Sequence, residues 1–140
     1  MNKIRLRARP ALAALALTLT ALGGLASPAH AATPAELLAG YSAQAGAAAV
    51  PARGQAFFTS RHGREWSCSS CHGAVPTQAG RHAATGKAIG ALAPGFNAER
   101  FSDAAKVEKW FRRNCNDVVG RECTAAEKAD VLGWLISLKS

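Results

Sequence analysis

The segment "SCSSCHG", at residues 67–73, holds the feature that most constrains the fold: two cysteines three positions apart, followed directly by a histidine. This arrangement of Cys68, Cys71 and His72 is the signature of c-type haem attachment. Each thiol can form a thioether to a vinyl group of haem, and the adjacent imidazole can reach the iron from the proximal side. The motif occurs once, so we expect one covalently bound haem c, around which the chain must fold.

Two other interpretations of the cysteines have to be weighed. A thioredoxin-like redox pair also uses two cysteines at this spacing, but no β-α-β pattern surrounds this one. A zinc site would need all four cysteines, and Cys115 and Cys123 are separated by seven residues rather than the two to four of a zinc knuckle. Once haem takes Cys68 and Cys71, the remaining pair is available for a disulfide, which its spacing permits without proving.

The first 31 residues are organised as a secretory signal peptide. A basic start with Lys3, Arg5, Arg7 and Arg9 precedes an apolar run, and small residues end the segment at Ala31. The apolar run, about 16 residues long, is shorter than the roughly 20 that span a bilayer, which disfavours a membrane anchor. We therefore predict a cleaved signal peptide at 1–31, one cytochrome c domain at 32–140, and a periplasmic location.

Charge adds little to the functional assignment. Four of the 17 basic residues lie in the predicted signal peptide, so residues 32–140 carry 13 basic and 9 acidic side chains, a net charge of +4. No basic run is interleaved with aromatic residues, which argues against nucleic acid as a partner.

Export also takes the cysteines into an oxidising compartment, where free thiols do not usually persist.

The rest of the chain predicts an all-α domain of four or five short helices, a small fold like that of class I cytochromes c. Capping boxes at Thr33 and Thr124 begin the first and last helices. We place the helices at 33–46, 51–63, 102–114 and 124–138, with Ser102 as the cap of the third. The Gly- and Ala-rich segment 73–101 fits no period and is predicted to wrap the haem edge as a loop, and no strand is expected.

The residue opposite His72 on the iron is not the usual methionine. Met1 is the only methionine, and it leaves with the signal peptide. His62, His82, a lysine, an asparagine or no residue at all remain as candidates. On a helical wheel Asn114 falls within the apolar stripe that begins at Val107, so its amide would need a partner, which iron can provide. The alternative is that Asn114 only caps the C-terminus of its helix.

Six segments resemble the sphaeroides haem protein (SHP) family over nearly the whole predicted mature chain. They are "TPAELLAGY", "SCSSCHG", "TGKAIGALAP", "RFSDAAKVEKW", "RNCNDVVGREC" and "EKADVLGWL". In that family the iron has an asparagine as its sixth ligand, immediately before the first cysteine of a disulfide. The resemblance therefore implies that Asn114 is the second axial ligand, opposite His72, and that Cys115 is bridged to Cys123.

The resemblance also implies a function. In the family the asparagine leaves on reduction and O₂ or NO can bind, with electrons supplied by a dihaem cytochrome c or a membrane b-type cytochrome. An oxygen-dependent activity that removes NO, like that of a dioxygenase, has been suggested for it; no catalytic residue is assigned here. The alternative is a plain periplasmic electron-transfer cytochrome c without a ligand-binding role.

Overall fold

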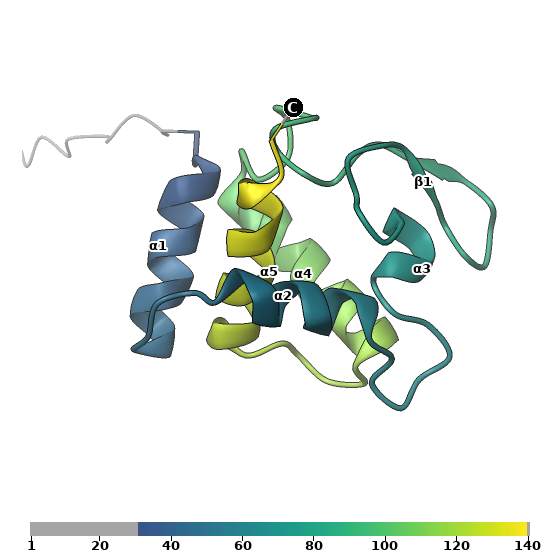
Figure 1. Ribbon diagram of the computed structural model, residues 1–140, viewed down its shortest axis with the longest axis horizontal. Coiled ribbons are helices and arrows are strands. Elements are labelled where there is room, and N and C mark those ends of the chain that lie inside the picture. Colours follow the sequence, from purple (N-terminus) through teal and green to yellow (C-terminus); the bar gives the residue numbers. More distant parts are fainter. Residues whose placement is uncertain (1–30, 140) are drawn as a thin grey trace, which may run out of the picture.

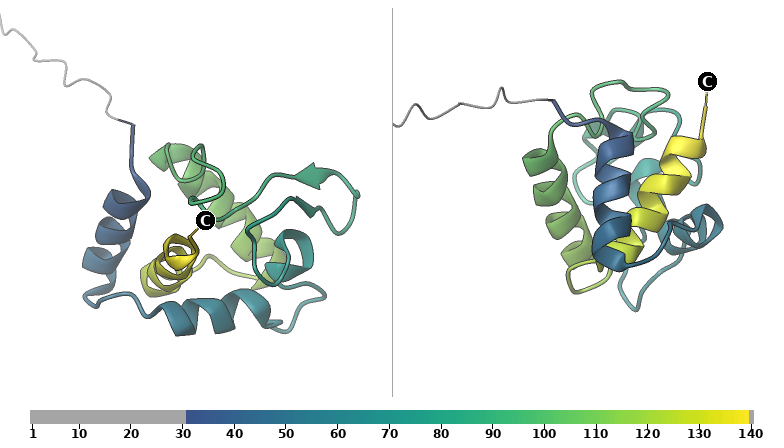
Figure 2. Two further views of the ribbon diagram at one scale, coloured as in Figure 1. Left: turned by 45° about the horizontal axis from the view of Figure 1, so that its top comes forward. Right: turned by 90° about the vertical axis from the view of Figure 1, so that its left-hand side faces the viewer.

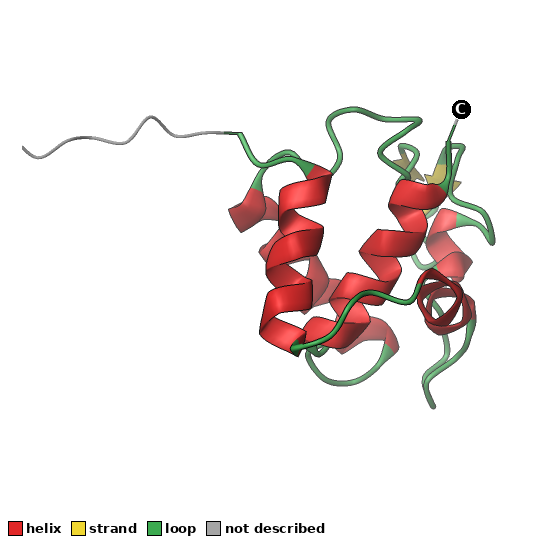
Figure 3. Ribbon diagram, turned by 60° about the vertical axis from the view of Figure 1, so that its left-hand side comes forward, coloured by secondary structure: helices red, strands yellow, loops and turns green. Residues whose placement is uncertain are grey.

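The computed structural model describes residues 31–139, so the predicted signal peptide lies outside the described part except for its last residue. The elements are α1 (Pro34–Ala45), α2 (Pro51–Thr59), α3 (Ser69–His72), β1 (Gly80–Arg81), β2 (Ala88–Ile89), α4 (Ala104–Val118) and α5 (Ala125–Ser137) (Figure 1). Among these helices, none combines the length and the apolarity that crossing a bilayer requires. Helices dominate, and the strands form one small hairpin (Figure 3).

Helix α5 is the centre of the fold, with α1, α2 and α4 arranged around it (Figure 2). It begins at the predicted capping box: Thr124 accepts from the backbone N–H of Glu127, and the Glu127 carboxylate accepts from the backbone N–H of Thr124. Every residue from Ala129 to Leu135 is buried. Burial all round the helix is what an apolar helix covered on several sides requires.

The crossing of α2 over α5 depends on a glycine. A Cβ atom at Gly54 would lie 2.0 Å from the carbonyl oxygen of Asp130, so no larger residue fits unless the helices move apart. Next to this contact, Phe58 is fully buried and its ring centroid lies 5.1 Å from that of Trp134. This crossing therefore holds α2, and the segment that follows it, against the core.

Asp130 supplies the N-terminal cap that α2 lacks in its own sequence. Val50, at the N-cap position, makes no side-chain hydrogen bond, but its backbone N–H donates to Asp130 Oδ1 at 2.7 Å. Arg53 also donates to the same carboxylate from Nε and Nη2. A buried charge needs such partners, and here they come from a helix about 80 residues earlier in the chain.

Helix α1 follows the prediction closely. Thr33 and Glu36 form the capping box, and Gly46 ends the helix with a φ of 64°. Its buried Tyr41 reaches α4, because the hydroxyl donates to Glu108 Oε1 at 2.6 Å and the ring meets that of Phe111 edge-on at 5.7 Å. Burial, with the hydrogen bond to Glu108, raises the pKa of Tyr41 well above its usual value, so the phenol stays protonated.

Helix α4 differs from the prediction at both ends. Asp103 rather than Ser102 caps it, accepting from the backbone N–H of Lys106 at 3.0 Å. The helix runs to Val118, four residues beyond the predicted end at Asn114, and the chain then turns at Gly120 with a φ of 81°. Asn114 therefore lies inside the helix, with a full turn after it.

The segment 73–101 is mostly irregular, as predicted, but it contains the unexpected hairpin. Gly80 pairs with Ile89 and Arg81 with Ala88 in an antiparallel register. The hairpin is packed tightly on the haem motif, since a Cβ at Gly80 would lie 2.1 Å from the Cys71 carbonyl oxygen. Two residues a strand are too few to produce an alternating pattern, so the sequence carried no strand signal.

Candidate functional site

The motif residues Cys68, Cys71 and His72 are brought together by the single turn of α3. Cys68 precedes this turn, and its carbonyl accepts from the backbone N–H of His72 at 3.1 Å. Ser70 stabilises the entry by accepting from the backbone N–H of Ser67 at 3.0 Å. Both thiols are half-buried and are not bonded to each other. The turn thus presents two sulfur atoms and one imidazole from five consecutive residues.

The structure argues against the two other uses of the cysteines. Burial raises the pKa of Cys68 to about 11, whereas a redox-active thiol of the thioredoxin type needs a lowered pKa. Cys115 and Cys123 form a disulfide with a Cα–Cα distance of 5.6 Å, so they are not available to zinc. Across residues 31–139, no group of three or more His, Cys, Asp and Glu side chains could hold a metal ion.

His72 has the properties that an iron ligand needs. Burial, with a smaller effect from the positive charge of Arg100, lowers its pKa to about 4, so the imidazole is neutral near pH 7. The ring lies on the core side against Phe58, with centroids 6.2 Å apart. Its buried Nδ1 has no hydrogen-bond partner among the described residues. A neutral ring that is not committed to hydrogen bonds fits coordination to haem iron.

Asn114 lies near one edge of the buried stripe of α4 rather than at its middle, as the helical wheel had placed it. Val107, Cys115 and Val118 are buried, whereas Asn114 is exposed. Trp110, one turn earlier on the same side, is 43% exposed. Within the described part of the chain the Asn114 side chain makes no hydrogen bond, so its amide is free to bind another group.

Capping is not the role of Asn114. Helix α4 continues to Val118, and its last carbonyls accept from the backbone N–H groups of Val119 and Gly120. The neighbouring Asn116 has a local partner instead, because its amide donates to the carbonyl of Arg112 at 2.8 Å. The two asparagines therefore differ, and only Asn114 has an uncommitted amide.

The tertiary fold brings the end of α4 to the region of the haem motif. The C-terminal half of α4 lies toward the same end of the molecule as α3 (Figures 1 and 2). Arg64, four residues before Cys68, lies against Gly120, where a Cβ atom would be 2.8 Å from Arg64 Nε. The disulfide follows directly after Asn114 and ties α4 to the segment that precedes α5.

Two other histidines of the described residues, His62 and His82, each have a protein partner. His62 Nε2 lies 2.9 Å from the carbonyl oxygen of Phe57, and the two rings stack with centroids 4.3 Å apart. His82 Nδ1 accepts from the backbone N–H of Thr85 in the hairpin turn. The next residue, Ala83, donates its N–H to Cys71 Sγ at 3.3 Å, so this turn lies beside the haem motif. Each of these hydrogen bonds uses one ring nitrogen of its histidine, whereas the Asn114 side chain makes no hydrogen bond within residues 31–139.

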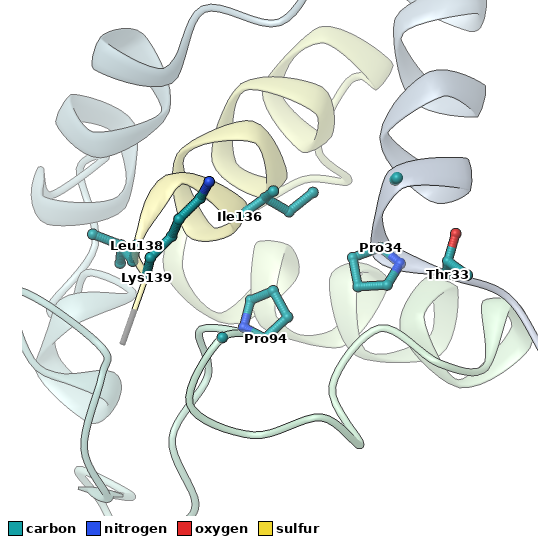
Figure 4. Close-up of a pocket in the computed structure, with 8 residues that line it drawn as sticks. Thr33, Pro34, Pro94, Ile136, Leu138 and Lys139 are labelled. Atoms are coloured by element: carbon teal, nitrogen blue, oxygen red, sulfur yellow. The ribbon is translucent and has the colours of Figure 1, made fainter.

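A surface groove of about 490 Å³ lies away from these residues, between the start of α1 and the end of α5 (Figure 4). Pro34, Pro94 and Ile136 are among its lining residues, and none of the predicted site residues lines it. It therefore has no part in the candidate haem site.

An all-α fold with a single Cys-x-x-Cys-His turn against its core defines a small class I-like c-type cytochrome. Residues 44–135 match the model of a domain of unknown function, DUF1924. The chain is 53% identical over 117 residues to the cytochrome c-type protein SHP of Cereibacter sphaeroides, covering 79% of this chain and 90% of that protein. It is 41% identical over 80 residues to cytochrome c'' of Methylophilus methylotrophus, covering 57% of this chain and 56% of that protein.

Solved structures agree with these sequence matches. Oxidised SHP, described as an oxygen-binding cytochrome c, superposes with a TM-score of 0.73 at 51% identity, covering 77% of this chain and 99% of that one. Oxidised cytochrome c'' gives a TM-score of 0.69 at 33% identity, covering 76% and 95%. The chain belongs to the SHP family of c-type cytochromes. This membership confirms the predicted fold class and the cofactor, one covalently bound haem c.

Proposed function

We propose that this protein is an exported monohaem cytochrome in which Asn114 and His72 are the two axial ligands, and in which Asn114 is released on reduction so that O₂ or NO can bind. Cys68 and Cys71 would hold the haem by thioethers. The observation that carries the proposal is the uncommitted amide of Asn114 inside α4, next to a disulfide. The description of solved SHP as oxygen-binding supports it.

The ligand exchange follows from the chemistry of the amide. Haem iron would supply the redox change and the coordination position. The amide oxygen of Asn114 is a neutral, hard donor, which suits ferric iron better than the softer ferrous iron. We therefore expect Asn114 to be bound in the oxidised protein and free in the reduced one. Once free, its N–H can donate a hydrogen bond to a diatomic molecule in the site.

The position of Asn114 in α4 would make its release reversible. The residue lies within a helix whose end is tied by the bond between Cys115 and Cys123, so the backbone cannot move far. Because helical side chains lean toward the N-terminus, we expect the Asn114 amide to lean toward the turn that holds Trp110. The exposed indole would line the space into which the amide swings.

Absorption spectra with carbon monoxide test the proposal. The reduced wild-type protein should give a fast and complete spectral shift, whereas a plain electron carrier with two permanent ligands would give none. The variant Asn114→Leu should change the ferric spectrum, because one ligand is lost. Asn116→Leu is the matched control and should leave that spectrum unchanged, since its amide bonds to Arg112. An unaltered ferric spectrum in Asn114→Leu would refute the assignment.

The remaining elements of the proposal have their own tests. Consumption of NO by the reduced protein in the presence of O₂ measures the proposed NO-removing activity. Reduction by a dihaem cytochrome c or by membranes that contain a b-type cytochrome measures the electron supply. Cleavage after Ala31 and a periplasmic location are tested by the N-terminal sequence of the protein recovered from that compartment.

A further inference from the structure

Arg100 is held rigidly in the segment that leads into α4. Its Nε donates to the carbonyl of Ala91 at 2.9 Å, and its Nη2 donates to the carbonyl of Gly90 at 2.8 Å. Asn97 also donates to the Ala91 carbonyl, at 3.2 Å. The guanidinium is thus fixed by two carbonyls of one loop, which costs the side chain its rotamer freedom.

The backbone next to Arg100 reinforces this fixed position. Phe101 has a φ of 59°, the one positive φ of a non-glycine residue in the described structure, and its side chain is buried in the core. A bulky residue in the left-handed region is strained and persists only where the surroundings enforce it. The buried side chain of Phe101 therefore anchors the backbone next to Arg100 in the core.

The charge of Arg100 has no carboxylate partner among residues 31–139. Three other arginines of this part form ion pairs with Asp or Glu: Arg53, Arg112 and Arg121. These three are more than half exposed at their side chains, whereas Arg100 is half-buried. Partial burial of an unpaired cation is unfavourable, and neutral carbonyls do not balance its charge.

The loop that holds Arg100 is hydrogen-bonded to the segment that follows the haem motif. The backbone N–H groups of Leu92 and Ala93, which follow the two accepting carbonyls, both donate to the carbonyl of Pro76. Pro76 lies four residues after His72 and is fully buried. The guanidinium is therefore on the side of the molecule where the cofactor is attached.

We propose that Arg100 binds a propionate carboxylate of the haem. Haem carries two carboxylates, and a guanidinium fork that keeps free N–H groups is the group best suited to bind one. The loop carbonyls of Gly90 and Ala91 act as the positioning groups that hold the fork. This role requires only the haem c of the family and does not depend on ligand exchange at Asn114.

The reduction potential of the haem is the first readout. Loss of a cation next to the propionate leaves more negative charge near the iron and favours the ferric state, so Arg100→Gln should lower the potential. Arg81→Gln is the matched control: Arg81 is exposed on the hairpin beside α3, donates to one carbonyl and has no ion pair within residues 31–139. The reduction potential of the haem in Arg81→Gln should stay at the wild-type value.

The vibrational bands of the propionates in resonance Raman spectra are the second readout, and they report the carboxylate directly. Arg100→Gln should shift a propionate band that Arg81→Gln leaves in place. Arg100→Lys keeps the charge without the fork and should give a smaller change in potential together with a shifted band. If Arg100→Gln does not mature, Arg100→Lys carries the test alone.

Unchanged propionate bands in the Arg100 variants, or an equal drop in potential in Arg81→Gln, would overturn the proposal. Carbon monoxide binding by reduced Arg100→Gln separates this outcome from a failure of the proposed function. Carbon monoxide binding by this variant should remain complete, because Arg100 has no part in releasing Asn114.

Discussion

Removing the disulfide tests how the structure holds α4 and Asn114 in place. The bond joins Cys115, inside α4, to Cys123, which precedes the cap of α5, at a sequence separation of 8. In the chain-entropy treatment, a closed loop of about nine residues restricts the unfolded chain by about 2.6 kcal/mol at 25 °C. For a domain of this size that loss lowers the melting temperature by about 10–20 °C.

The free energy of unfolding should be measured by guanidinium titration of the ferric protein for Cys115→Ala, Cys123→Ala and the double variant. Each single substitution already breaks the bond, so all three should lose about the same free energy, and the double loss should fall well short of the sum. Both cysteines are buried, which makes alanine the appropriate replacement. Additive losses, or a double variant that loses less than about 1 kcal/mol, would refute this account of the bond.

The same double variant has a functional readout that rests on the proposed ligand exchange. With the end of α4 no longer tied, the Asn114 amide should return more slowly when the reduced protein is reoxidised. Stopped-flow absorption at the haem bands measures this rate. A return as fast as in the wild type would show that the bond stabilises the fold without guiding the ligand.

Three further predictions concern the fold around the site. Phe58→Ala should destabilise the protein by about 3–5 kcal/mol in denaturant titration, because the ring is fully buried between His72 and Trp134. Gly54→Ala should cost about 1–3 kcal/mol through its clash with α5, whereas Gly40→Ala, where the new Cβ meets nothing within 4 Å, should be neutral or slightly stabilising; equal effects would contradict the role of the crossing. The hydrogen bond from Arg121 holds the pKa of Glu127 below its usual 4.5, so the stability that this carboxylate contributes is present above pH 4.5 and is lost as the pH falls through the folded-state pKa. Unfolding free energies between pH 7 and pH 3 should therefore fall less steeply in Glu127→Gln, and an identical slope would contradict the assignment.

Local chemistry made much of this protein predictable from its sequence. The two capping boxes and the glycine that ends α1 depend on residues within a few positions of one another, and each was found where it was expected. The haem motif is equally local, and the cofactor that it predicts is confirmed by membership of the SHP family. The absence of a methionine beyond Met1 likewise follows from composition alone and removes the usual sixth ligand. The specific segment around Asn114 pointed to the SHP family, which the comparisons confirmed.

Both ends of α4 were predicted incorrectly. At its N-terminus two adjacent residues compete for the position of the cap. Ser102 and Asp103 are both good caps, and only the backbone geometry of the formed helix shows that Asp103 is the one used. The periodic segment predicts an end at Asn114, yet the helix continues to Val118 and the chain turns only at Gly120.

Contacts between distant segments were decided by the tertiary structure alone. Asp130 caps a helix that begins about 80 residues earlier, and Gly54 is required only because α5 crosses it. Arg100 was not singled out in the sequence, since an isolated arginine in a loop resembles any solvated surface charge. Its proposed role rests on the carbonyls of Gly90 and Ala91 that hold it and on the lack of a carboxylate partner among residues 31–139. Sequence patterns report interactions along the chain, whereas burial and charge compensation depend on which segments folding brings together.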